Sequence, residues 1–195
     1  GHDILVEGPL SSKLFHNLQW FFVPMVAKAF RMYHEIRIKP SSLIDTHLEG
    51  DGNATGFSGG IDSFAAVIQH LVNEETPNYQ ISHFLFHNVG AHGHKSPLKA
   101  RELFRKRLEE VKDFSQKVGI PIIPIDSSLT EILTMDFERM YITLNASALM
   151  VLQNKFLRYY YASSYKYADC GVLKSDLIGR FDPIAFHLLS TESLE

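Results

Sequence analysis

From residue 54 onward, apolar runs alternate between the short pattern of buried strands and the 3.6-residue period of helices. We expect strands at 54–57, 81–87, 121–126 and 159–163, and helices at 62–73, 97–118 and 146–156. The longest helix places apolar residues inward every three or four positions, and Gly119 stops it; these residues are Leu103, Phe104, Leu108, Val111, Phe114 and Val118. Strands that alternate with helices predict an α/β fold, a mostly parallel sheet with helices on both faces.

The first 50 residues have a different pattern. We expect a short strand at 3–7, then a helix capped by Ser11 or Ser12, which Pro24 kinks or ends. Its apolar face consists of Leu14, Leu18, Phe21 and Met25. Alternation predicts a second strand at 33–39, broken by Pro40-Ser41-Ser42. We therefore divide the chain into an N-terminal extension of helix and strands (1–50), which we expect to serve substrate binding or homodimerisation, and a main domain (51–195).

The candidate chemistry lies between the first strand and the first helix of the main domain, where residues 56–63 read Gly-Phe-Ser-Gly-Gly-Ile-Asp-Ser. A strand, a glycine turn and a helix start bring backbone N–H groups together around an anion. Ser58 and Ser63 add hydroxyl donors, and Asp62 fits beside an anion if it holds a metal that bridges to phosphate. The alternative is an ordinary capped helix after a tight turn.

This octet resembles the Ser-Gly-Gly-x-Asp-Ser signature of the PP-loop ATP pyrophosphatases, a superfamily that includes NAD, GMP and asparagine synthetases and tRNA-modifying enzymes. Neither the Gly-Lys-Ser/Thr of P-loops nor the Gly-x-Gly-x-x-Gly of dinucleotide folds is present. The resemblance implies a three-layer fold with strand order 3-2-1-4-5 and ATP across the carboxyl ends of the strands. It also implies the cleavage of ATP to AMP and pyrophosphate, with ATP and Mg²⁺ as cofactors.

The same resemblance assigns the site residues. Asp62 and Ser63 are the expected catalytic residues, and Asp62 is the expected Mg²⁺ ligand. Residues expected to bind the phosphates or flank the nucleoside are Phe57, Ser58, Gly59, Gly60, Ile61, Asp62, Ser63, Phe86, His87 and Asn88. A late basic residue commonly returns to the phosphates in this family, and the candidates are Arg158, Lys174 and Arg180. Residues 188–192 resemble a late motif of some PP-loop proteins.

Other features have two interpretations each. The helix residues 99–117 carry basic side chains interleaved with acids, which indicates either a solvated face with ion pairs such as Arg105 with Glu109, or a tRNA contact. Histidines in 87–94 match no zinc template and are expected near the nucleotide or in a loop that closes over substrate. Cys170, the single cysteine, is expected to be an inert apolar residue in a reducing cytoplasm.

Composition narrows the function further. A net charge of −3 argues against a dedicated nucleic-acid binder, and no apolar run reaches the length of a membrane span. Gly1-His2 and Leu194-Glu195 look like vector sequence, so we expect a piece of a longer protein, truncated at its C-terminus. We predict a cytoplasmic adenylating enzyme that activates an unknown small molecule or tRNA for amidation, ligation or sulfur transfer. The alternatives are a non-catalytic nucleotide-binding module and a tRNA-modifying enzyme that needs a missing C-terminal part.

Overall fold

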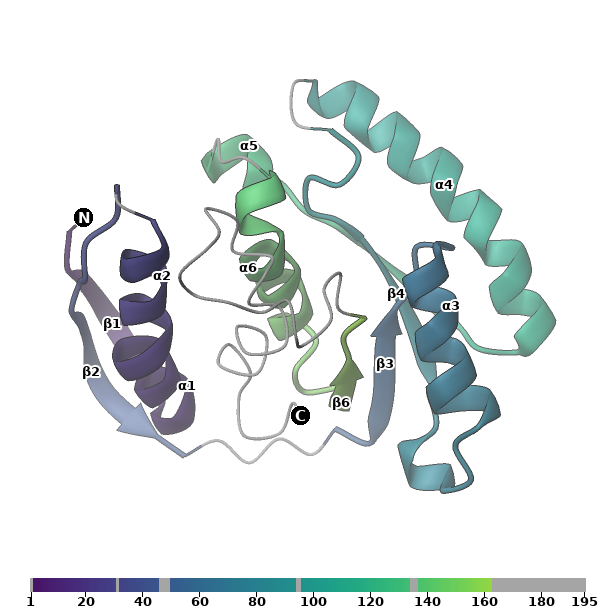
Figure 1. Ribbon diagram of the computed structural model, residues 1–195, viewed down its shortest axis with the longest axis horizontal. Helices are drawn as coiled ribbons and strands as arrows, with labels where there is room; N and C mark the ends of the chain where they lie inside the picture. Colours follow the sequence, from purple (N-terminus) through teal and green to yellow (C-terminus); the bar gives the residue numbers. More distant parts are fainter. Residues whose placement is uncertain (1, 31, 46–49, 94–95, 134–136, 163–195) are drawn as a thin grey trace.

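The computed structural model describes residues 2–30, 32–45, 50–93, 96–133 and 137–162, in which strands and helices alternate along the chain (Figure 1). The N-terminal unit consists of β1 (Ile4–Ser11), α1 (Ser12–Asn17), the π-helical turn η1 (Leu18–Phe22), α2 (Val23–Ala29) and β2 (Ile38–Ile44). The main unit consists of β3 (Gly52–Gly56), α3 (Ile61–Val67), η2 (Ile68–Val72), η3 (Pro77–Tyr79), β4 (His83–Asn88), α4 (Pro97–Val118), β5 (Ile122–Asp126), α5 (Leu129–Leu133), α6 (Phe137–Met150) and β6 (Phe156–Tyr160).

The main sheet is parallel, and its described strands lie in the order β5-β4-β3-β6. β3 is an inner strand that pairs with both β4 and β6, through Ala54 opposite His83 and opposite Tyr159. The predicted α/β class with a parallel sheet is therefore confirmed. The fifth strand of the expected order 3-2-1-4-5 falls outside the described residues.

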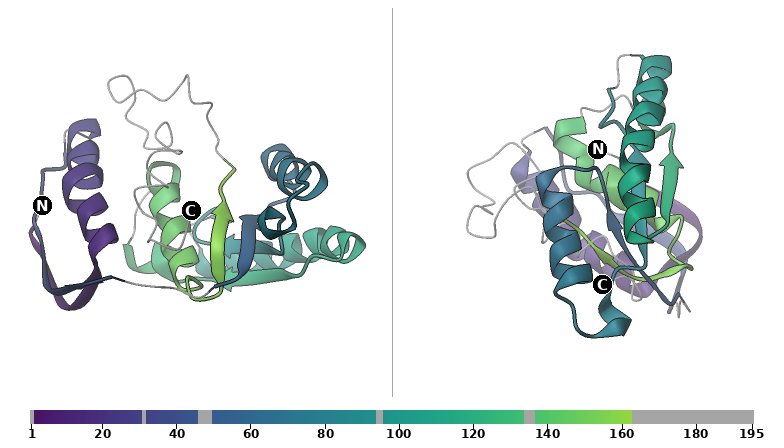
Figure 2. Two further views of the ribbon diagram at one scale, coloured as in Figure 1. Left: turned by 90° about the horizontal axis from the view of Figure 1, so that it is seen from below. Right: turned by 90° about the vertical axis from the view of Figure 1, so that its right-hand side faces the viewer.

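Helices flank this sheet, and the alternation along β4 determines which helix meets which face. Phe84 and Phe86 belong to a buried cluster with residues of α3 and α4, whereas Leu85 belongs to a second cluster with residues of α6. Figures 1 and 2 show α3 and α4 on one side of the sheet and α6 on the other. α4 has the predicted bounds, and its buried residues include Phe104 and Leu108.

The prediction of a helix at 146–156 and a strand at 159–163 was wrong in position. α6 begins at Phe137 and ends at Met150, and β6 begins at Phe156, whose side chain is fully buried. The early part of α6 contains Tyr141, Ile142 and Thr143, which have weak intrinsic helix propensity. Packing of Ile142 in the core cluster outweighs that local preference.

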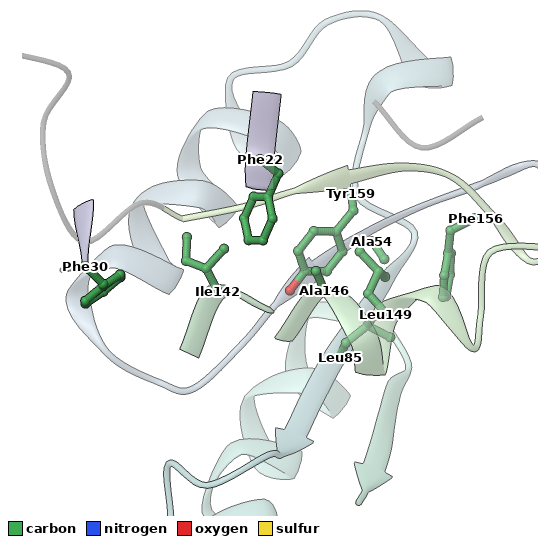
Figure 3. Packing of buried hydrophobic residues seen from close by; sticks show 9 residues of the cluster. All are labelled: Phe22, Phe30, Ala54, Leu85, Ile142, Ala146, Leu149, Phe156 and Tyr159. Atoms are coloured by element: carbon green, nitrogen blue, oxygen red, sulfur yellow. The ribbon is translucent and has the colours of Figure 1, made fainter. Parts of the chain in front are cut away.

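The N-terminal helix is interrupted by the π turn η1, which comes directly before Pro24 at the start of α2. Proline has no N–H to donate within a helix, and a π turn holds one extra residue. The extra residue rotates the apolar face of the helix. Phe22 is therefore buried, whereas Phe21, which the sequence predicted on the apolar face, is 50% exposed. Figure 3 shows Phe22 near Ile142 of α6 and Tyr159 of β6. Ser11 caps α1 as predicted, accepting from the Leu14 N–H at 3.3 Å.

The second N-terminal strand also lies later than predicted. β2 runs through Pro40-Ser41-Ser42 and pairs in parallel with β1, with Val6 opposite Pro40. Pro40 is tolerated because, among the described residues, this sheet has two strands, so each one is an edge where a missing N–H need not break pairing. At the start of β2 the backbone also bonds to a side chain: the Gln19 amide donates to the Ile36 carbonyl at 3.1 Å and accepts from the Ile38 N–H at 2.7 Å.

Phe22→Ala is expected to lower the free energy of unfolding by about 3 kcal/mol, because a buried aromatic side chain leaves a cavity. Phe21→Ala, the adjacent exposed control, is expected to change it by less than about 1 kcal/mol. Urea denaturation of both variants measures the difference. Equal losses would contradict the rotation of the helix face at η1.

Candidate functional site

The octet forms a turn that is anchored in the core at its first side chain. After β3 the Phe57 N–H donates to the Leu85 carbonyl of β4 at 2.9 Å. The Phe57 ring is 1% exposed and stacks on Phe84 and Phe114, with ring centroids 4.6 and 5.0 Å apart. This anchoring leaves the following residues, Ser58 to Gly60, exposed at the carboxyl end of the strand.

Two features fix the conformation of the turn itself. Gly59 has φ of +77°, and a Cβ there would lie 3.2 Å from Val111 Cγ1, so the turn lies against α4 at a position that favours glycine. The Ser63 hydroxyl donates to the Gly60 carbonyl at 2.8 Å, and the Ser58 and Ser63 hydroxyl oxygens are 3.3 Å apart. The turn is therefore tied both to α4 and to the first turn of α3.

A cleft of about 650 Å³ opens beside this turn. Its lining comes from both sides of the sheet, with the octet, the end of β4, one side of α4, one side of α6 and the end of β6. The lining residues are Gly56, Phe57, Ser58, Gly59, Gly60, Asp62, Ser63, Leu85, Phe86, His87, Ala91, His92, Arg107, Glu110, Phe137, Tyr141, Asn145, Tyr159, Tyr161 and Ala162. The carboxyl ends of parallel strands are where open α/β sheets bind ligands.

Most of the predicted site residues lie together in this cleft: Phe57, Ser58, Gly59, Gly60, Asp62, Ser63, Phe86 and His87. Two do not. Ile61 is 88% exposed and does not line the cleft. Asn88 is buried and donates to Asp126 Oδ1 of β5 at 2.6 Å, because the residue after His87 points to the opposite side of the strand.

The sequence interpretation missed the opposite walls. Arg107 and Glu110 come from α4, on the same helix side as Val111, one turn away. Arg107 makes no ion pair with another residue of the described chain. Tyr141 and Asn145 come from α6. Asn145 lies at helical spacing from the buried Ile142 and Leu149, and a polar residue on that face was the available signal for this wall.

The neutral ring of His87 is held in one tautomer by a hydrogen bond to α6. The Asn145 amide donates to the Tyr141 carbonyl at 2.8 Å, so its oxygen faces His87 Nδ1, 3.0 Å away. Nδ1 must then carry the proton, and Nε2 is left as an acceptor. Nε2 is buried and has no hydrogen-bond partner within the described structure. Burial lowers the pKa of His87, and the bond to Asn145 only partly opposes this, so the ring is neutral near pH 7.

Tyr159 closes the floor of the cleft between β3 and β6. Burial raises the pKa of its phenol, so the hydroxyl keeps its proton at neutral pH, although a hydrogen bond with the Gly56 backbone opposes the shift. A Cβ on Gly56 would lie 2.7 Å from the Tyr159 hydroxyl oxygen. The small residue at the end of β3 thus makes room for the phenol.

The remaining residues singled out from the sequence lie on α4, in the loop after β4, or outside the described residues. On α4, the described ion pairs are Lys112 with Glu109 at 2.6 Å and Arg101 with both Glu131 at 2.6 Å and Asp126 at 3.5 Å, in place of the predicted Arg105–Glu109 pair. His92 lines the cleft, and burial, then the charge of Arg107, lower its pKa while Asp126 opposes. Cys170, Lys174, Arg180 and residues 188–192 lie outside the described residues.

Within the described chain, no group of three or more His, Cys, Asp or Glu residues is arranged to hold a metal ion. The same part of the chain has no helix that is both long and apolar enough to cross a membrane. No protein-family model matches this sequence, and neither a curated protein nor a solved structure shows detectable similarity to it. The function is therefore inferred from the chain's own residues.

The free energy of unfolding is expected to fall as the pH drops from about 7 to 5.5. Burial lowers the folded-state pKa of His70, His83, His87 and His92, so the unfolded chain binds protons first. Urea denaturation across this range checks the trend. His87→Asn is expected to flatten it, whereas His16→Asn, at an exposed position, is not. A stability that rises towards pH 5.5 would contradict the assignment.

Proposed function

We propose that the cleft binds Mg·ATP and that the protein cleaves it to AMP and pyrophosphate while transferring the adenylyl group to an acceptor substrate. In this proposal the chain is a PP-loop ATP pyrophosphatase with a three-layer fold and strand order 3-2-1-4-5. The observation that carries the proposal is the position of the octet. Its turn opens into a cleft at the carboxyl end of the inner strand, and Arg107 faces the same space.

The turn residues are suited to the leaving pyrophosphate. Backbone N–H groups in the first turn of α3 have no partner within the helix, and fixed donors of this kind stabilise charge that develops on phosphate oxygens. Ser58 is exposed and lines the cleft, so its hydroxyl can donate to the same group. The Ser63 hydroxyl already donates to the Gly60 carbonyl and so stabilises the turn. A contact between Ser63 and the leaving pyrophosphate stays a prediction.

Arg107 takes the place that the sequence assigned to a late basic residue. It lies one helical turn from Val111, the residue in contact with Gly59, and so faces the phosphate side of the cleft. Its guanidinium has no carboxylate partner among the described residues and is available for bidentate bonds to phosphate oxygens. Arg158, one of the predicted candidates, instead lies over the Tyr79 ring, 4.1 Å from its centroid.

Magnesium fits this site without a metal cluster. Mg²⁺ is commonly held by one or two carboxylates together with substrate phosphates and water. Asp62 and Glu110 both line the cleft, and Asp62 lies in the first turn of α3 beside the phosphate turn. When bound with ATP, the ion would neutralise phosphate charge.

The acceptor oxygen attacks the α-phosphorus, the bond to the bridging oxygen of the β-phosphate breaks, and pyrophosphate leaves. Native protein is therefore expected to exchange radiolabelled pyrophosphate into ATP when the right acceptor is present. A panel of carboxylic acids, cyclic amides and tRNA tests this. ATP binding without exchange throughout the panel would favour a non-catalytic nucleotide-binding module.

Asp62→Ala is expected to weaken Mg·ATP binding by about tenfold, because a ligand of the ion is lost, whereas the α4 control Asp113→Ala is expected to leave it unchanged. Unchanged affinity in calorimetric titration would refute the metal role of Asp62.

Arg107→Ala is expected to weaken binding of Mg·ATP and of Mg·pyrophosphate by about 1.5 kcal/mol, roughly tenfold, because a charge-assisted hydrogen bond is lost. Arg105→Ala removes an exposed guanidinium from the same helix and should leave both affinities unchanged. Titration calorimetry on the two variants separates the site contribution from the general charge of α4. Equal effects would contradict a specific phosphate contact.

A further inference from the structure

The cleft has two sides with different chemistry. The phosphate side holds the octet turn together with Arg107 and Glu110 of α4. The opposite side, which we call the tyrosine side, consists of His87, Tyr141, Asn145, Tyr159 and Tyr161. These residues contact one another. His87 is hydrogen-bonded to Asn145, and the centroid of the His87 ring lies 6.4 Å from that of the Tyr159 ring. The Tyr159 ring centroid lies 6.5 Å from that of Tyr161.

The tyrosine side carries no charged group among its described residues. The carboxylates and the guanidinium that line the cleft, Asp62, Glu110 and Arg107, come from the octet and α4. The phenol of Tyr159 is protonated, and so contributes no negative charge. A carboxylate bound here would lose its hydration and find no cation among the described residues of the tyrosine side, which is costly. Aromatic walls instead favour a flat, uncharged molecule.

His87 adds a specific requirement. Its Nδ1 is bonded to the Asn145 oxygen, and the opposite face of that amide is bonded to the Tyr141 carbonyl. Neither ring nor amide can reverse without losing one of these bonds. Nε2 is therefore fixed as an acceptor, and it is buried without a partner in the described structure. A ligand with an N–H group placed there would satisfy it.

We propose that the tyrosine side binds the acceptor substrate, and that this acceptor is an uncharged cyclic amide whose ring N–H donates to Nε2 of His87. The inference rests on the proposed function, because the amide's carbonyl oxygen would be the group that attacks the α-phosphorus. His87 is then the residue that selects the acceptor, and Asn145 is a positioning residue that keeps the proton of the neutral ring on Nδ1, so that Nε2 is the acceptor.

Three probes of similar size test this by saturation-transfer NMR on native protein with a non-hydrolysable ATP analogue and Mg²⁺. 2-Pyridone is a cyclic amide with an N–H, N-methyl-2-pyridone lacks that hydrogen, and benzoate is a flat carboxylate. We expect 2-pyridone to bind about tenfold or more tightly than either control, since a site built for an N–H rejects analogues that lack it. Equal binding of 2-pyridone and its N-methyl analogue, or preference for benzoate, would overturn the inference while Mg·ATP binding still upholds the proposed function.

Variants of His87 and Asn145 test which residues cause the preference for 2-pyridone over its N-methyl analogue. His87→Phe keeps a ring of similar size and is expected to abolish the discrimination, whereas His87→Gln retains an acceptor oxygen and should keep part of it. Asn145→Leu is expected to reduce the discrimination because it releases the imidazole. Discrimination that survives in His87→Phe would overturn the assignment of Nε2. Native protein that binds no ATP would overturn the proposed function and the inference with it.

Discussion

The small side chains of β3 are the constraint on which the cleft depends. Gly52, Asn53, Ala54 and Thr55 are all buried, and the strand pairs on both sides. Its polar members bond inward: Thr55 Oγ1 donates to the Tyr160 carbonyl at 2.8 Å, and the Asn53 amide donates to the carbonyls of Asn78 and Gln80. Larger residues would separate β3 from the aromatic side chains beside it, because a Cβ on Gly52 would lie 3.0 Å from Phe156 Cδ1. The octet stays in place because this strand cannot move independently of its neighbours.

Local sequence signals determined what could be predicted of the fold. α4 has the predicted bounds because a long amphipathic period, a proline at its start and a glycine after its end are all local. The π turn before Pro24 is different, since periodicity treats a helix as regular and cannot place an extra residue. α6 and β6 were displaced for a related reason: Ile142 and Phe156 take their conformations from burial against segments far away in the sequence.

The candidate site was predictable on one side only. The octet is contiguous in the sequence, so its residues lie together in the structure. His87 was predictable because it lies at the carboxyl end of the next strand. Which basic residue of α4 faces the cleft depends on helix rotation, about 100° per residue, and the interleaved charges give no sign of it. Asn145 and Tyr159 belong to the cleft because α6 and β6 pack beside β3 and β4, a tertiary fact that a single sequence does not carry.

The hydroxyls of the octet form a chain with a defined direction. The Ser63 hydrogen is committed to the Gly60 carbonyl, so in the short contact between the two serines it is Ser58 that donates and Ser63 that accepts. The Ser58 oxygen in turn accepts from the Gly60 N–H at 3.4 Å. An anion arriving at the turn can therefore receive the Ser58 hydrogen through rotation about a single C–O bond, with every heavy atom left in place. In the proposed function, recognition of an anion at this point would be a reorientation of one proton, with the heavy atoms of the turn left in place.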